Sequence, residues 1–215
     1  MNTRAIKYLL GTALLFYGFT LSAETLIVPY SSFYSHSKKI VGEETNALQF
    51  AFGFKLVQST ELCTINSALI HTQKQDLPIT LIKQQRFTVP SDKVLKMARA
   101  EVVLELQQAA NRCDMSVQLE TKADYLKHRY SKQELQMLLD QYQAFFNGMG
   151  SFLSFMMPEV QGLTLHFSDE SQLPSLPEGL KLDKRKLLLS SEWIASAKGL
   201  KLDKAPLRIT AIVVK

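Results

Sequence analysis

Apolar and polar residues alternate strictly along residues 48–56, and this period of two predicts a β-strand. One face of the strand is apolar and rich in aromatic rings, formed by Leu48, Phe50, Phe52, Phe54 and Leu56. The opposite face contains Ala51 and Gly53, which are small enough for another segment to approach closely. Small residues also line thin or solvated faces, so the pattern alone leaves both interpretations open.

Other apolar segments of strand length lie on either side of this one. We expect strands at 25–28, 62–71, 79–89, 115–119, 163–167 and 207–214. The strand at 79–89 contains a polar break at 83–85. Because short links join 48–56, 62–71 and 79–89, an antiparallel meander is favoured.

Two long helices are expected from apolar residues at helical spacing. The first begins at Pro90-Ser91-Asp92, with Ser91 as its N-cap, and runs to about Asn111. The second begins at Ser131-Lys-Gln-Glu134, which is a capping box. Shorter helices are expected at 30–40 and 190–197.

The second long helix leads into residues 145–157, which are rich in Phe and Met. Asn147-Gly148 should bend or loosen the helix there. The stretch fits an adaptable groove for a partner helix or a lipid, and it also fits an ordinary buried helix. If exposed, its binding surface would consist of Phe145, Met149, Phe152, Phe155 and Met156.

Residues 1–23 have the pattern of a cleavable signal peptide. Arg4 and Lys7 precede an uncharged apolar segment that ends near Leu21, and Ala23 suits cleavage. An uncleaved anchor is the alternative, although the segment is short for a membrane span. No cysteine follows it, which excludes a lipoprotein anchor at the mature N-terminus. We therefore expect a periplasmic or secreted protein with no transmembrane segment after signal removal.

Cys63 and Cys113 are the only cysteines. Export and an even cysteine count favour a structural disulfide. A redox or metal-binding pair is the alternative, but the chain has no C-x-x-C and no suitably spaced histidine. The bond would close a loop of about fifty residues, for which chain entropy predicts a stabilisation of roughly 4 kcal/mol.

The composition is that of a folded protein, with 46% apolar and 21% charged residues. The net charge is +5, and residues 179–215 hold nine basic residues against three acidic ones. A proline-bearing connector near 173–179 separates a main domain, 24–170, from a connector and basic extension, 171–215. The basic segment fits contact with an anionic envelope surface, or a solvated lysine-rich face. Its candidate contact residues are Lys181, Lys184, Arg185, Lys186, Lys201 and Lys204.

Catalytic signatures are missing from the sequence. It has no G-x-S-x-G, H-E-x-x-H, P-loop or dinucleotide fingerprint. Of the scattered histidines His36, His71, His128 and His166, we single out His166, on the polar side of the strand expected at 163–167. We assign no catalytic residue, and we expect no metal, no cofactor and no nucleic-acid partner.

Several sequence pieces together resemble a family of exported gammaproteobacterial proteins that carry a domain of unknown function. They are Tyr30-x-x-x-Tyr34, Cys63-Thr-Ile65, Val89-Pro-Ser-Asp-Lys-Val-Leu-Lys96, Arg112-Cys-Asp-Met-Ser116 and Met157-Pro-Glu-Val-Gln-Gly-Leu-Thr-Leu165. In addition, Leu207-Arg-Ile-Thr-Ala211 resembles the C-terminal end of the family. The resemblance covers roughly residues 25–167 and implies a periplasmic or envelope setting. It also supports the pairing of Cys63 with Cys113, and it implies no activity.

The sequence thus predicts an α+β protein, with a mostly antiparallel sheet packed against two long helices and a small basic C-terminal βαβ-like extension. The preferred function is a non-catalytic binding or interaction module of the cell envelope, with an envelope protein or an anionic envelope surface as partner. The alternatives are a periplasmic hydrolase acting on envelope material and a structural or assembly factor with a fixed protein partner. A hydrolase would need a histidine within hydrogen-bonding reach of a carboxylate and a nucleophile.

Overall fold

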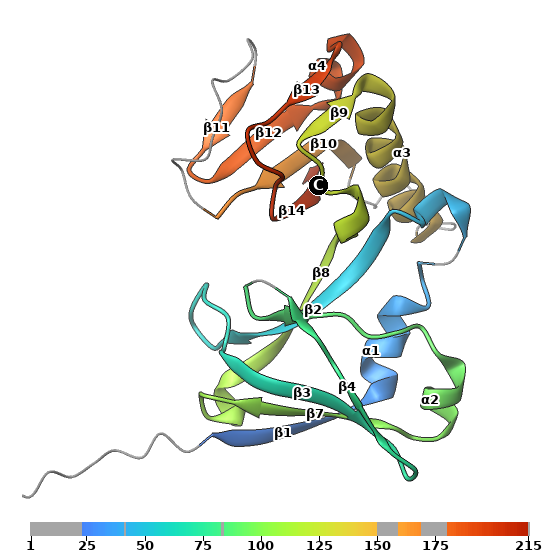
Figure 1. Ribbon diagram of the computed structural model, residues 1–215, viewed down its shortest axis with the longest axis vertical. Helices are drawn as coiled ribbons and strands as arrows, with labels where there is room; N and C mark the ends of the chain where they lie inside the picture. Colours follow the sequence, from blue (N-terminus) through green and yellow to red (C-terminus); the bar gives the residue numbers. More distant parts are fainter. Residues whose placement is uncertain (1–22, 41, 83, 150–158, 169–179, 215) are drawn as a thin grey trace, which may run out of the picture.

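The computed structural model describes residues 23–40, 42–82, 84–149, 159–168 and 180–214. The chain forms an N-terminal and a C-terminal lobe, and a long two-stranded ribbon runs from one to the other (Figure 1). The strands pair antiparallel throughout the sheets. The α+β class and its mostly antiparallel character are therefore confirmed.

The N-terminal lobe is built on a four-stranded sheet in the order β1-β7-β3-β4. Its strands are β1 (Glu24–Pro29), β3 (Ile65–His71), β4 (Asp76–Pro78) and β7 (Glu101–Leu106). Two short helices belong to this lobe, α1 (Tyr30–Ser37) and α2 (Lys93–Met97). The hydroxyl of Tyr30 on α1 donates to the Pro90 carbonyl and accepts from the Asp92 amide, which joins α1 to the start of α2.

The ribbon consists of β2 (Leu48–Leu56) and β8 (Cys113–Thr121), paired in unbroken register from Leu48↔Thr121 to Leu56↔Cys113. The hairpin of β5 (Leu81–Ile82) and β6 (Arg86–Phe87) adds to the other edge of β2. The break predicted at 83–85 falls between these two strands, where Gln84 and Gln85 form a turn. Short 3₁₀ turns occur at η1 (Glu43–Thr45), η2 (Ala110–Arg112) and η3 (Ala123–Tyr125).

The C-terminal lobe combines a further four-stranded sheet with the longest described helix. The sheet order is β11-β12-β10-β14, with β10 (Glu159–His166), β11 (Lys181–Asp183), β12 (Lys186–Ser190) and β14 (Arg208–Val214). A smaller pair joins β9 (Arg129–Ser131) to β13 (Gly199–Lys201). Because β12 and β14 flank β10, the basic C-terminal segment and the preceding domain share one sheet.

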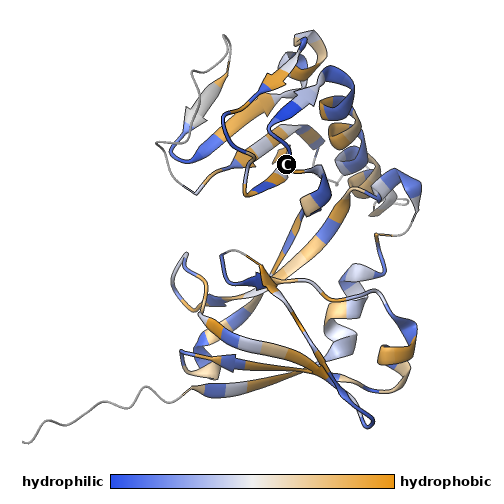
Figure 2. Cartoon of the chain, viewed as in Figure 1, coloured by the Kyte–Doolittle hydropathy of each residue, from blue (hydrophilic) through white to orange (hydrophobic). Residues whose placement is uncertain are grey.

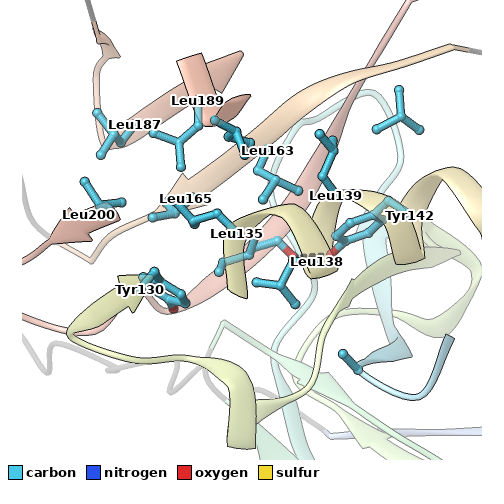
Figure 3. Packing of buried hydrophobic residues seen from close by; sticks show 14 of the residues in the cluster. Tyr130, Leu135, Leu138, Leu139, Tyr142, Leu163, Leu165, Leu187, Leu189 and Leu200 are labelled. Carbon is cyan, nitrogen blue, oxygen red and sulfur yellow. Dashed lines mark hydrogen bonds between the residues drawn. The ribbon is translucent and has the colours of Figure 1, made fainter. Parts of the chain in front are cut away.

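Helix α3 (Lys132–Met149) begins at the predicted capping box, and α4 (Ser191–Ser196) is short. The Ser131 amide donates to the Glu134 carboxylate at 2.8 Å, and the Glu134 amide donates back to the Ser131 hydroxyl at 3.2 Å. Hydrophilic and hydrophobic residues mix along α3, as expected for a helix with one buried face (Figure 2). That face packs leucines onto the sheet of the C-terminal lobe, where Leu135, Leu138 and Leu139 meet Leu163, Leu165, Leu187 and Leu189 (Figure 3).

Each lobe has its own hydrophobic core, and the ribbon contributes to both. Leu48 belongs to the C-terminal core, whereas Phe52 and Phe54 belong to the N-terminal one. Phe50, between them, packs against both cores. The aromatic face predicted for residues 48–56 is therefore real, and it serves two cores in succession.

The prediction of a long helix from Ser91 to Asn111 is wrong. Only Lys93–Met97 is α-helical in this span, and its N-cap is Asp92, whose carboxylate accepts from the Val94 amide at 2.6 Å. The following residues form β7, in which Val102, Leu104 and Leu106 are buried. Apolar residues in this segment fit both the helical and the strand period, and pairing with a strand on each side favours the strand. One long helix, not two, is therefore found among the described residues.

Within the described ranges, no helix combines the length and the apolarity needed to cross a bilayer.

Candidate functional site

The polar face of the ribbon forms the floor of a cleft. Gln49 and Glu120 are direct cross-strand partners on this face, and the Gln49 side-chain amide donates to the Glu120 carboxylate at 3.1 Å. Next along the same face of β2 come Ala51 and Gly53, both buried. Small side chains leave room here for the β5–β6 hairpin, which lies directly on the ribbon. A Cβ atom on Gly53 would lie only 2.9 Å from the Gln85 carbonyl oxygen.

This close approach brings Arg86 over the ribbon, where it is 7% exposed. Its guanidinium donates to the carbonyl oxygens of Ala51 and Ser116, both at 3.4 Å, and to the Ser116 hydroxyl at 3.3 Å. These bonds are long, and every acceptor is neutral. The Nε atom of Arg86 is buried without a hydrogen-bond partner. The donor capacity of this arginine is therefore only partly used.

The turn that carries Arg86 has an unusual backbone. Gln84 and Gln85 both have left-handed φ angles, 66° and 58°, where glycine or asparagine is normally preferred. The Gln85 side chain holds the turn in place, because its oxygen accepts from the Ile65 amide at 2.7 Å. Strained residues of this kind occur often beside functional sites, where the surrounding structure fixes them.

A second arginine, Arg208, reaches the cleft from the C-terminal lobe. It opens β14, which lies beside β8, and its cross-strand partner on β10 is His166. Its Nε atom is also buried without a partner, and its side chain makes no hydrogen bond to the described residues. Burial lowers the pKa of Arg208, and the nearby Glu120 charge raises it. The pKa of Arg86 is likewise lowered, first by burial and then by the Arg208 charge.

Glu120 is the buried acid of the cleft, 4% exposed. Burial raises the pKa of its carboxyl, while Gln49 and the two arginines lower it. Neither arginine forms an ion pair with Glu120 within 4.0 Å, since the ion pairs of the described chain lie elsewhere. The three groups therefore face one space with a net charge of +1, and none neutralises another by direct contact.

That space is a cavity of about 460 Å³. Gln49, Arg86, Glu120 and Arg208 belong to its polar lining, and Leu81, Ile82 and Leu126 belong to its apolar lining. A neighbouring hollow of about 570 Å³ shares both arginines and adds Lys55, Glu61 and Arg185. We call the two adjoining spaces the arginine cleft. Both volumes fall within the range typical of small-molecule binding sites, about 300–1,000 Å³.

Comparison with known proteins places the chain in a family. Residues 22–167 match the family described as "Protein of unknown function (DUF2987)". The chain belongs to the DUF2987 family. Comparison with the curated proteins and with the solved structures finds no match. The DUF2987 segment contains Gln49, Arg86 and Glu120, whereas Arg208 and Arg185 lie beyond its end.

The two cysteines lie at disulfide distance, with their sulfur atoms 2.08 Å apart and their Cα atoms 6.2 Å apart. Cys113 is the first residue of β8. Cys63 lies just before β3, and its amide donates to the Phe54 carbonyl on β2. The pair therefore fastens the end of the ribbon that is remote from Glu120. It lies outside the arginine cleft, which agrees with a structural role.

The apolar surface predicted near the end of α3 is only partly described. Phe145 is buried in the C-terminal core at 6% exposure, so it does not contribute to a surface. Met149 is 46% exposed at the last position of α3. Phe152, Phe155 and Met156 lie outside the described residues, and a binding surface there stays a prediction.

Among the predicted basic contact residues, Lys184, Arg185, Lys186, Lys201 and Lys204 are exposed. The side chain of Lys181 lies outside the described part of the molecule. Arg185 donates to the Ser168 carbonyl at 3.2 Å and lines the larger hollow of the arginine cleft. Contact of the others with an anionic surface stays a prediction.

The histidines do not converge on one site. His71 pairs with Asp76 at 2.6 Å on the surface, and His36 contacts the rings of Phe50 and Phe52. His128 lies 3.3 Å from the Asp203 carbonyl. Across the described ranges, no group of three or more His, Cys, Asp or Glu residues is arranged to hold a metal ion.

His166 lies behind Arg208, with its Nε2 atom 2.9 Å from the Thr210 hydroxyl. Burial, then the charges of Arg208 and Lys186, lower its pKa to about 3. His166 is therefore neutral at physiological pH, and it lines neither hollow of the arginine cleft.

Sequence reasoning missed Arg86, Glu120 and Arg208 as site residues. One signal did point to the cleft, namely the small face formed by Ala51 and Gly53. The segment that packs closely against these small residues is the hairpin that carries Arg86.

Proposed function

We propose that this protein is a non-catalytic binding module that holds a small anionic solute, recognised through a carboxylate or phosphate group, in the arginine cleft. One observation carries the proposal. Arg86 and Arg208 come from different lobes, border the same cavity, and each keep a buried Nε atom without an acceptor.

A buried cation such as Arg86, or a half-buried one such as Arg208, is costly to a fold unless a partner compensates it. An arginine remains protonated in proteins, so it cannot avoid the cost by losing its charge. Removing a charged group from water without pairing it is unfavourable by several kcal/mol. A bound carboxylate or phosphate would supply the missing acceptors, because its oxygens match the planar fork of a guanidinium.

An envelope setting remains part of the proposal. The family match, residues 22–167, begins at the end of the predicted signal segment, and the disulfide suits an oxidising compartment. The basic C-terminal segment would contribute through Arg208 and Arg185 rather than as a separate surface.

The hydrolase alternative has less support from the described residues. Its best candidate, His166, has a threonine hydroxyl at 2.9 Å, and the charged groups that shift its pKa are both cations. A catalytic base is instead normally oriented and supported by a carboxylate or a carbonyl group. A pKa of about 3 also makes His166 a weak base at neutral pH.

The proposal is tested by measuring thermal unfolding of the purified protein with succinate, citrate, inorganic phosphate and sulfate at constant ionic strength. An anion at a hundred times its Kd should add about 2.7 kcal/mol of stability. For a chain of this length, that corresponds to a rise in Tm of roughly 5–10 °C.

Arg86→Gln and Arg208→Gln should each abolish the rise in Tm. Arg129→Gln provides the matched control, since Arg129 is exposed on β9 and does not line the cleft. It should leave the response unchanged. Equal responses in all four proteins, or no response to any of the anions, would contradict the proposal.

A further inference from the structure

Glu120 distinguishes this cleft from a simple anion site. A carboxylate can accept about four hydrogen bonds, yet Glu120 receives a single one from the described residues, donated by Gln49. The side chain is 4% exposed and lines the cavity together with both arginines. A bound anion would therefore share a poorly hydrated space with a second negative charge. A cationic group on the ligand, placed at Glu120, would remove this repulsion.

The ribbon fixes the approximate spacing of the two kinds of charge. Arg86 is bound to the Ala51 carbonyl, and Glu120 is held by the Gln49 side chain. Ala51 and Gln49 are two residues apart on the same face of β2, which separates their Cα atoms by about 7 Å. Two charge-assisted hydrogen bonds of about 2.8 Å, one on either side of a ligand, take up most of this spacing, so the anion and the cation must lie close together in the ligand. A carboxylate and an ammonium group on one carbon atom fit this spacing.

The rest of the cavity indicates what else such a ligand carries. Leu81 and Ile82 come from β5, and Leu126 follows η3, so apolar side chains from two segments share the cavity with the charged groups. These side chains favour an apolar substituent on the ligand by the ordinary hydrophobic effect. A small, wholly polar anion would leave this part of the cavity unused.

We infer that the arginine cleft binds a free α-amino acid with an apolar side chain. Its carboxylate lies between Arg86 and Arg208, its ammonium group binds Glu120, and its side chain contacts Leu81, Ile82 and Leu126. The inference rests on the proposed function and specifies the ligand class for the same site.

The decisive comparison uses L-leucine, 4-methylpentanoic acid, which lacks its ammonium group, and 3-methylbutylamine, which lacks its carboxylate. Affinities are measured by titration calorimetry on the purified protein, after a thermal-unfolding screen of the standard L-amino acids. L-leucine, or the best apolar amino acid in the screen, should bind roughly ten- to a hundred-fold more tightly than its des-amino analogue. The amine should bind weakly, because it offers nothing to the arginines.

Glu120→Gln should remove the preference for the amino acid over its des-amino analogue. Asp114→Asn is the matched control, because Asp114 lies on the same face of β8, is exposed, and does not line this cavity. It should retain the full preference. The wild-type comparison of ligands stands by itself if Glu120→Gln does not fold.

The outcomes separate the inference from the proposed function. Equal affinities for L-leucine and 4-methylpentanoic acid, both abolished by Arg86→Gln, would overturn the amino-acid inference and leave the anion site intact. Binding of phosphate or citrate without binding of any apolar amino acid would do the same. Failure of every anion and every amino acid to bind would overturn both.

Discussion

The hydroxyl of Tyr142 donates to the carbonyl oxygen of Ile209 at 2.7 Å and lies 3.1 Å from the hydroxyl of Thr121. Thr121 follows Glu120 in β8, and Ile209 follows Arg208 in β14. A single buried hydroxyl on α3 therefore links the strand of the buried Glu120 to the strand of the half-buried Arg208. Tyr142 packs at the end of the leucine row of α3 (Figure 3).

Replacing Tyr142 by phenylalanine should destabilise the protein by about 1–3 kcal/mol, because the Ile209 carbonyl loses its donor in a dry environment. It should also weaken anion binding, since Glu120 and Arg208 lose a common anchor. Chemical unfolding and calorimetry measure the two effects. Tyr125→Phe removes a hydroxyl with no described hydrogen bond, and its effect should stay within about 0.5 kcal/mol. Equal effects of the two substitutions would contradict this role of the Tyr142 hydroxyl.

Arg86→Met should leave the stability of the ligand-free protein unchanged or raise it by up to about 2 kcal/mol, because it replaces a poorly compensated buried cation by an apolar side chain. The same substitution should abolish anion binding. Urea unfolding of both proteins without added anions measures the stability. A loss of more than about 2 kcal/mol would instead assign Arg86 to the structural framework.

Gly53→Ala should destabilise the protein by about 1–3 kcal/mol, because its Cβ must displace the backbone of Gln85. Anion affinity should fall as well, since Arg86 moves with that backbone. Gly148→Ala is the opposite case. Gly148 is exposed on α3 with open space around its Cβ position, so alanine should stabilise by up to about 1 kcal/mol. Wild-type anion affinity in Gly53→Ala would show that the close approach does not position Arg86.

The low pKa of His166 predicts a loss of stability in mild acid. The unfolded histidine takes up a proton near pH 6.5, whereas the folded one does so only near its pKa of about 3. Stability is therefore lost as the pH falls through this window, by no more than about 1.4 kcal/mol per pH unit.

His166→Gln should flatten the stability curve between pH 6.5 and 5, relative to the wild type. Carboxyl groups, including Glu120 with its raised pKa, titrate in both proteins, so the difference between the two curves isolates the histidine. Parallel curves for wild type and His166→Gln would rule out the histidine as the cause.

Reduction of the disulfide should lower the free energy of unfolding by up to about 4 kcal/mol, the chain-entropy value for a loop of this size. Anion affinity at neutral pH should change little, because the bond lies at the opposite end of β8 from Glu120. Cys63→Ala/Cys113→Ala, compared with the oxidised wild type, measures both quantities. A large drop in affinity in the folded variant would link the bond to the cleft.

Local patterns predicted much of the fold. The alternation at 48–56 corresponds to β2, and the capping box at 131–134 corresponds to the start of α3. The break at 83–85 corresponds to the connection between β5 and β6. Prediction failed at 91–111, where apolar spacing suits both a helix and a strand. Pairing with β1 and β3, which are distant in sequence, decides that segment.

The cleft was less accessible to prediction, because its charged residues are scattered. Glu120 lies within the residues of an ordinary strand, and Arg208 is one of many basic residues near the C-terminus. Only pairing across β2–β8 and β10–β14 brings them to one cavity. Gly53 gave a correct hint of close approach, but no local pattern names the residue that approaches.

The charged residues of the cavity lie on both sides of the end of the family match. The matched segment alone supplies Arg86 and Glu120, whose charges sum to zero, and the strand after it adds the cation that makes the cavity positive. Removing the Arg208 charge alone would leave a cavity whose remaining charged groups, Arg86 and Glu120, balance each other. The sign of the charge in the cavity therefore depends on a strand of the C-terminal lobe.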